Sequence, residues 1–120
     1  MDPTLQEVAT AITTEKSLGI RVYLTGVAVV VAPFFEELLF RGILLPAVAK
    51  RYGVGWAIVL VSLAFAGIHL HLPSLVPLFV MAVAFSLAYL HTGSILAPAV
   101  MHGLFNAVNI LLLTALRTPS

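Results

Sequence analysis

A few residues able to take part in acid–base or oxyanion chemistry stand in segments that are otherwise apolar. They are Glu36, Glu37, Arg41, His69, His102 and Asn106. A carboxylate with a neighbouring histidine can take a proton from water, and an amide with a second histidine can donate hydrogen bonds to an oxyanion. The set therefore suits the hydrolysis of an amide bond by an activated water molecule.

The two adjacent glutamates have different surroundings if their segment is helical. Glu37 and Arg41 are four residues apart, so they share a helix face and can pair. Glu36 is turned away from Glu37 by about 100°. We therefore expect the Glu37–Arg41 pair to support the structure. Glu36 needs a partner on another helix, because an unpaired carboxylate is costly in an apolar interior.

The histidines and asparagines offer such partners. His102, Asn106 and Asn109 fall on one helix face, at spacings of four and three residues. His69 closes a different apolar segment. Buried polar groups also join helices by hydrogen bonds, at about 0.6 to 2 kcal/mol each. We expect this adhesive role for Asn109 and Ser62, whereas spacing alone leaves both roles open for His102 with Asn106.

The usual protease nucleophiles and metal motifs are missing. The chain has no cysteine, and its only aspartate is Asp2. It contains no HExxH sequence and no serine preceded two positions earlier by glycine, as the nucleophile of a GxSxG motif would be. A protease of this sequence must therefore rely on glutamate and histidine.

The composition indicates a membrane protein. Hydrophobic residues make up 61% of the 120 residues and charged residues 9%, against about 25% charged residues in soluble domains. No Asp, Glu, Lys or Arg occurs from Tyr52 through Leu116. The net charge of +1 gives no electrostatic support for binding nucleic acid. Lipid is the solvent that suits such a chain.

The apolar segments have the lengths of membrane-spanning helices. We predict an all-α fold, a polytopic membrane helix bundle of about four transmembrane helices with a short N-terminal interfacial helix. The spans are expected near residues 20–49, 54–70, 74–90 and 95–116. Short loops make neighbouring spans antiparallel. Pro33 lacks a backbone donor and is expected to bend the first span just before the carboxylates.

The N-terminal segment, residues 1–18, is polar by comparison with the core at 19–117. Its apolar residues recur at helical spacing and are Leu5, Val8, Ala9 and Ile12. This pattern predicts an amphipathic helix at the membrane surface, with a frayed terminus as the equal alternative.

Three short motifs resemble those of the CPBP family, which includes the type II CAAX-prenyl endopeptidases and the Abi group of bacteriocin-immunity proteins. EELLFRG at 36–42 looks like the EExxxR motif of the family, FAGIH at 65–69 like its FxxxH motif, and HGLFN at 102–106 like its HxxxN motif. Each motif alone is weak, but the three occur in the family's order on three apolar spans. The resemblance covers roughly Ile20 to Leu112.

The resemblance implies a glutamate-dependent intramembrane endopeptidase. Carried over by position, Glu36 would activate water with the help of His69. His102 and Asn106 would form the oxyanion site. The substrate would be a peptide or a membrane protein, reached from the lipid bilayer.

The supporting residues and the metal follow from the same resemblance. Glu37 and Arg41 would support Glu36. The family is often labelled metalloprotease, and Glu36, His69 and His102 could supply a zinc site with an open position. A mechanism without metal is equally compatible with these residues.

Other interpretations stay open beside the protease. A non-enzymatic binding or immunity protein of the same fold would act by contact with a peptide or a membrane protein. An ion-conducting bundle fits less well, because its polar residues would be spread across the membrane. Members of the family usually have additional transmembrane helices, so we expect further helices or an oligomer. The expected location is a bacterial or archaeal plasma membrane.

Overall fold

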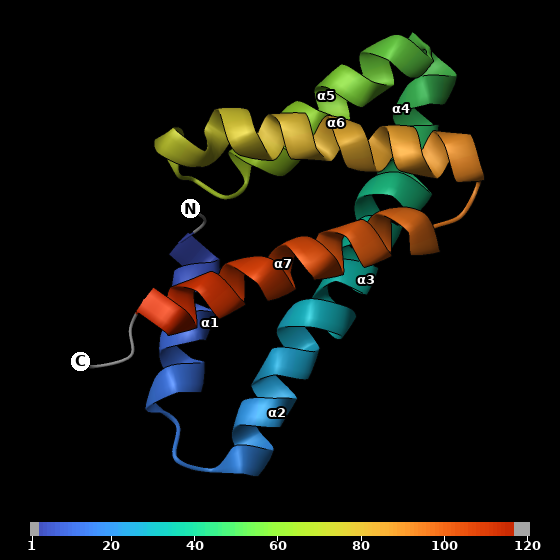
Figure 1. Cartoon of the computed structure of the whole chain (residues 1–120). Helices are drawn as coiled ribbons and strands as arrows, with labels where there is room; N and C mark the ends of the chain where they lie inside the picture. The colour runs from blue at the N-terminus through green and yellow to red at the C-terminus, as the bar shows by residue number, and fades with distance from the viewer. Residues whose placement is uncertain (1–2, 117–120) are drawn as a thin grey trace.

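The structure, a computed structural model, describes residues 3–116 as helices joined by short turns (Figure 1). The elements are α1 (Pro3–Thr14), α2 (Leu18–Gly26), the π-helical η1 (Val27–Val31), α3 (Ala32–Glu37), the π-helical η2 (Leu38–Leu44), α4 (Leu45–Tyr52), α5 (Val54–Gly67), the 3-10 turn η3 (Leu72–Ser74), α6 (Leu75–Thr92) and α7 (Leu96–Leu116). The predicted all-α fold is confirmed for this part of the chain. Met1, Asp2 and Arg117, which closes the predicted core, lie outside the described residues.

Three helices in the described residues are long and apolar enough to cross a membrane. They are Leu18–Tyr52, Leu72–Thr92 and Leu96–Leu116. The first is a continuous run from α2 to α4 and is called the long helix below. These three spans agree with the first, third and fourth spans predicted from the sequence.

The second predicted span is shorter than expected. Its helix α5 has 14 residues, which reach about 21 Å at 1.5 Å per residue, whereas a bilayer core is about 30 Å thick. The chain leaves the helix after Gly67, and Leu70 adopts a left-handed conformation with φ 52°. His69 consequently lies in a turn, not on the predicted helix.

The long helix widens into a π-helical segment just before each of its two prolines. A π-helical segment ends two residues before Pro33, and another ends two residues before Pro46. At the first of these, the Ala32 N–H donates to the carbonyl of Val27, five residues back. The carbonyl of Ala28 would need the N–H of residue 33 in the same pattern, and proline has none. The helix therefore presents an unpaired carbonyl to its neighbour.

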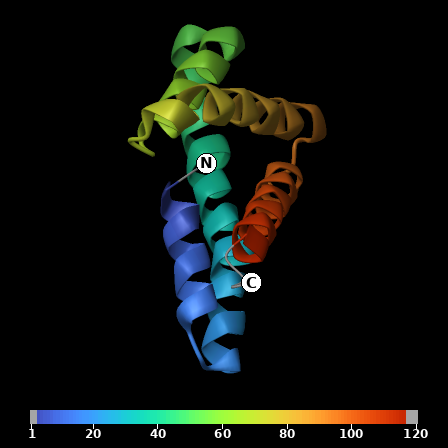
Figure 2. The ribbon, with the colours of Figure 1, turned by 60° about the vertical axis from the view of Figure 1, so that its left-hand side comes forward.

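The remaining helices cover two ends of the long helix. The antiparallel pair α5 and α6 packs against α4 and η2, while α1 and α7 lie along the first half of the long helix (Figure 2). Leu5, Ala9 and Ile12 of α1 are buried against Ala28 and Ile110. The predicted amphipathic helix therefore exists, and its apolar face is covered by protein.

Helix α7 approaches the long helix most closely at Gly103. A Cβ atom at this position would lie 2.4 Å from the carbonyl oxygen of Val29, which is closer than atoms can pack. Pro33 removes the N–H that would bond the Val29 carbonyl in an α-helix, since it follows four residues later. Glycine is thus needed where α7 crosses the widened segment.

Gly103→Ala is expected to destabilise the protein by about 1 to 3 kcal/mol, because the added methyl group must push the two helices apart. Thermal unfolding in detergent measures the change. Gly55→Ala is the matched control: its Cβ meets open space, and alanine is favoured over glycine in a helix by about 1 kcal/mol. Equal stability of the two variants would contradict the close crossing.

Candidate active site

Arg41 is fully buried where the long helix meets α6. Its Nη1 donates to Oε1 of Glu37 at 3.2 Å, as the four-residue spacing predicts. Its Nη2 donates to the carbonyl of Ala82 at 2.7 Å, and its Nε to Oγ of Ser86 at 3.3 Å. A buried cation is tolerated only when it is paired and hydrogen-bonded, and these contacts provide both.

Aromatic rings enclose the guanidinium. Its central carbon lies 5.0 Å from the ring centre of Phe65, 5.4 Å from that of Phe85 and 6.0 Å from that of Phe40. The faces of such rings carry negative charge and attract cations. Phe65 belongs to the FxxxH motif, so part of this motif holds the arginine of the first motif.

His102 on α7 joins the two neighbouring glutamates. Its Nδ1 lies 2.8 Å from Oε1 of Glu37, and its Nε2 lies 3.2 Å from Oε2 of Glu36. Oε1 of Glu37 also accepts from Arg41, and we assign the hydrogen of the contact with His102 to Nδ1. The imidazole stacks on Phe85, with ring centres 5.2 Å apart and an angle of 21° between the planes. Glu37 and Phe85 therefore fix the ring so that Nε2 faces Glu36.

The two glutamates differ in exposure. Glu37 is fully buried, whereas the side chain of Glu36 is 46% exposed. Glu36 finds its partner on another helix, as its helix face predicts. A ligand can thus reach Glu36 while Glu37 stays behind it, in contact with Arg41 and His102.

Asn106 lies one turn beyond His102. Its Nδ2 donates to the carbonyl of Ala28 at 3.0 Å, which is the carbonyl left unpaired by Pro33. An amide nitrogen has two N–H groups, so this bond uses one of them. Asn106 therefore joins α7 to the long helix while retaining one donor.

His69 is half-buried in the turn after α5. Its Nδ1 lies 2.8 Å from the carbonyl of Phe65, and the two rings are 5.2 Å apart. A carbonyl only accepts hydrogen bonds, so Nδ1 carries the hydrogen and Nε2 is the basic nitrogen of the neutral ring. The Phe65 side chain also makes an edge contact with His102 at 5.8 Å. Phe65 thus lies between the two histidines.

Two expected adhesive residues do not join helices. The Nδ2 of Asn109 donates to the carbonyl of Phe105 in its own helix at 2.7 Å. The buried Oγ of Ser62 has no hydrogen-bond partner in the described residues. Both predictions were wrong, because spacing gives a residue's face but not the group that stands opposite it.

Sequence reasoning missed the contribution of α6. Ala82, Phe85 and Ser86 contact Arg41 or His102, although the third span offered no acid, base or amide. Their spacing of three and four residues places them on one face, with two small residues that leave room for a guanidinium. This pattern of small and aromatic residues is the feature of the sequence that could have predicted the contact of α6 with the guanidinium.

The described residues do not form a ready metal site. No group of three or more His, Cys, Asp or Glu side chains among them is placed to hold a metal ion. Both ring nitrogens of His102 already face carboxylate oxygens. The zinc set suggested by the resemblance therefore does not fit this arrangement of the described residues.

A comparison with protein families identifies the family of the chain. Residues 18–108 match the family model described as type II CAAX prenyl endopeptidase Rce1-like. The chain belongs to this family. The match covers all six candidate residues, and with the three long apolar helices it makes the chain an integral membrane protein of the CAAX-protease type. No curated protein and no solved structure matches the chain.

Arg41→Met is expected to destabilise the protein by about 3 to 5 kcal/mol, because it leaves the carboxylate of Glu37 buried without a cation. Thermal unfolding in detergent measures the loss. Arg51→Met is the control, since its guanidinium lies over Tyr52 at an exposed end of the long helix. The double variant with Glu37→Gln should recover part of the stability. A double variant no more stable than Arg41→Met would contradict the role of the stranded charge.

Proposed function

We propose that the protein is an intramembrane endopeptidase in which Glu36 activates the water that cleaves a peptide bond. The observation that carries this proposal is the bridge from Nε2 of His102 to the half-exposed Glu36, with Glu37 fixing the other ring nitrogen. The base and the outer ring nitrogen of His102 thus meet at one accessible point, while the orienting carboxylate of Glu37 lies buried behind them.

The reaction needs a base that takes a proton from water and later returns it to the departing amine. Glu36 takes one proton from water as the water oxygen bonds to the carbonyl carbon of the substrate. The carbonyl oxygen becomes an oxyanion. When the carbon–nitrogen bond breaks, Glu36 gives its proton to the departing amine, and the other product is a carboxylic acid. His69, with its basic Nε2, assists in handling the proton of the water.

His102 and Asn106 serve as donors to the oxyanion. They lie on one face of α7. Asn106 uses one of its two N–H groups for the Ala28 carbonyl and keeps the other, whereas His102, whose Nδ1 faces Glu37, would donate from Nε2 in the form that carries a hydrogen on both ring nitrogens. Oxyanion donors work best when they are held in place before the reaction. The Glu37 bond and the Phe85 ring hold His102, and the Ala28 carbonyl holds Asn106.

Glu36→Gln is expected to lower cleavage by at least about 1000-fold and to leave the unfolding temperature within a few degrees of the unmodified protein, because the amide keeps the shape but cannot take a proton. A fluorogenic farnesylated CAAX peptide and its unprenylated form serve as probes in detergent. Glu7→Gln, at an exposed position on α1, is the control. Full cleavage by folded Glu36→Gln would refute the proposal.

Phe85→Leu is expected to lower kcat about tenfold or more with little change in KM, because the imidazole of His102 loses the ring that fixes its plane. Phe79→Leu is the control, since Phe79 packs at the edge of the same hydrophobic core on the same helix. The two variants should have similar unfolding temperatures. An equal loss of kcat in both would mean that Phe85 acts through stability alone.

A further inference from the structure

A trough runs along the long helix, beside α7 and the end of α1, and its lining residues include neither Glu36 nor His102. It consists of three hollows of about 290, 540 and 270 Å³ that share Val29 as a lining residue. The lining positions recur every three or four residues, from Leu18 to Phe34 on the long helix and from Leu96 to Thr114 on α7. Helix α7 lines the two smaller hollows, whereas Ile12 of α1 lies beside the long helix at the largest one. This periodicity makes the hollows parts of one continuous surface.

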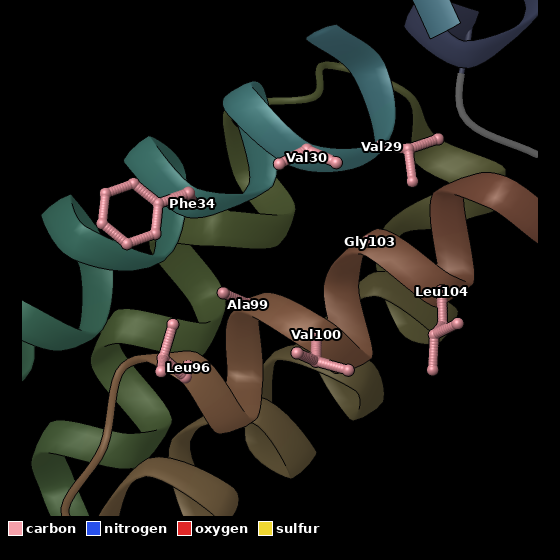
Figure 3. Close-up of a pocket in the computed structure, with 8 residues that line it drawn as sticks. All are labelled: Val29, Val30, Phe34, Leu96, Ala99, Val100, Gly103 and Leu104. Atoms are coloured by element: carbon pink, nitrogen blue, oxygen red, sulfur yellow. The ribbon is translucent and has the colours of Figure 1, made fainter. Parts of the chain in front are cut away.

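The trough is apolar along its length. Figure 3 shows its end near Phe34, where the labelled side chains of the two facing helices are all hydrocarbon and Gly103 has none. Gly26 lines the middle, and a Cβ there would meet no atom within 4 Å. The surface therefore accepts a flexible hydrocarbon chain.

One cation stands at the other end. Of the described residues that line the three hollows, only Arg21 is charged. Its exposed guanidinium has no hydrogen-bond or ion-pair partner among the described residues. The hydroxyls of Thr25 and Thr114 donate to carbonyls of their own helices. The guanidinium is thus the free polar group at the mouth of an apolar trough.

We propose that this trough binds an anionic phospholipid, with its phosphate on Arg21 and one acyl chain lying along the long helix from Arg21 toward Phe34. Guanidinium and phosphate form paired, charge-assisted hydrogen bonds. From Arg21 to Phe34 the helix rises about 20 Å at 1.5 Å per residue, which exceeds half of a bilayer core of about 30 Å. The trough is therefore long enough to hold an acyl chain, and its one cation selects the headgroup.

Native mass spectrometry of the full chain tests the proposal with phosphatidylglycerol and phosphatidylcholine of identical acyl chains. The unmodified protein should bind phosphatidylglycerol about tenfold more tightly than phosphatidylcholine. Arg21→Gln should weaken the binding of phosphatidylglycerol about tenfold, so that the two lipids bind equally. Gly26→Leu should weaken both lipids, because its side chain fills the trough. Arg51→Gln, at the opposite end of the long helix, should leave the preference unchanged. Circular dichroism confirms that each variant is folded.

Three results would overturn the site. They are equal binding of both lipids by the unmodified protein, an equal effect of Arg51→Gln and Arg21→Gln, and unchanged lipid binding in Gly26→Leu. Soluble glycerol phosphate separates a lipid site from a phosphate site: displacement of the lipid by it at equal concentration would show that the acyl chain is not held. The readout is binding, so the result does not depend on the proposed peptidase activity.

Discussion

The structure depends on a buried arginine that has to be neutralised. Arg41 has no exposed surface in a chain made almost entirely of apolar side chains. Removing a charge from water costs so much free energy that a buried guanidinium needs a countercharge and hydrogen-bond acceptors. Glu37 supplies the countercharge, while Ala82 and Ser86 supply hydrogen bonds from α6. Meeting this one requirement fixes the long helix against α6 and places Glu37 where His102 can reach it.

A second requirement arises from the backbone. Pro33 leaves a carbonyl of the widened helix without its usual partner, in surroundings where water is scarce. Asn106 supplies the missing hydrogen bond to Ala28, and Gly103 allows α7 to come close enough. The polar stripe of α7 therefore has a structural cause as well as a chemical use. The same contact that satisfies the backbone brings His102 beside the two glutamates.

These two requirements give the adjacent carboxylates of Glu36 and Glu37 different roles. Glu37 is enclosed and engaged by Arg41 and His102, whereas Glu36 is partly exposed and contacts the outer nitrogen of the imidazole. A helical turn of about 100° between neighbours is enough to give two identical side chains different surroundings. One can then hold a histidine in place while the other remains accessible to water and substrate.

The sequence by itself determined the membrane character, the helical class, the Glu37–Arg41 pair and the motif residues, because these follow from composition and from spacing along one helix. Only the tertiary structure decided which groups meet across helices: His102 with both glutamates, Asn106 with the Ala28 carbonyl, and Phe85 on the imidazole ring. It also shortened the second span, so that His69 lies in a turn. Such contacts depend on where and at what angle the helices cross, and the periodic pattern of a sequence does not contain this information.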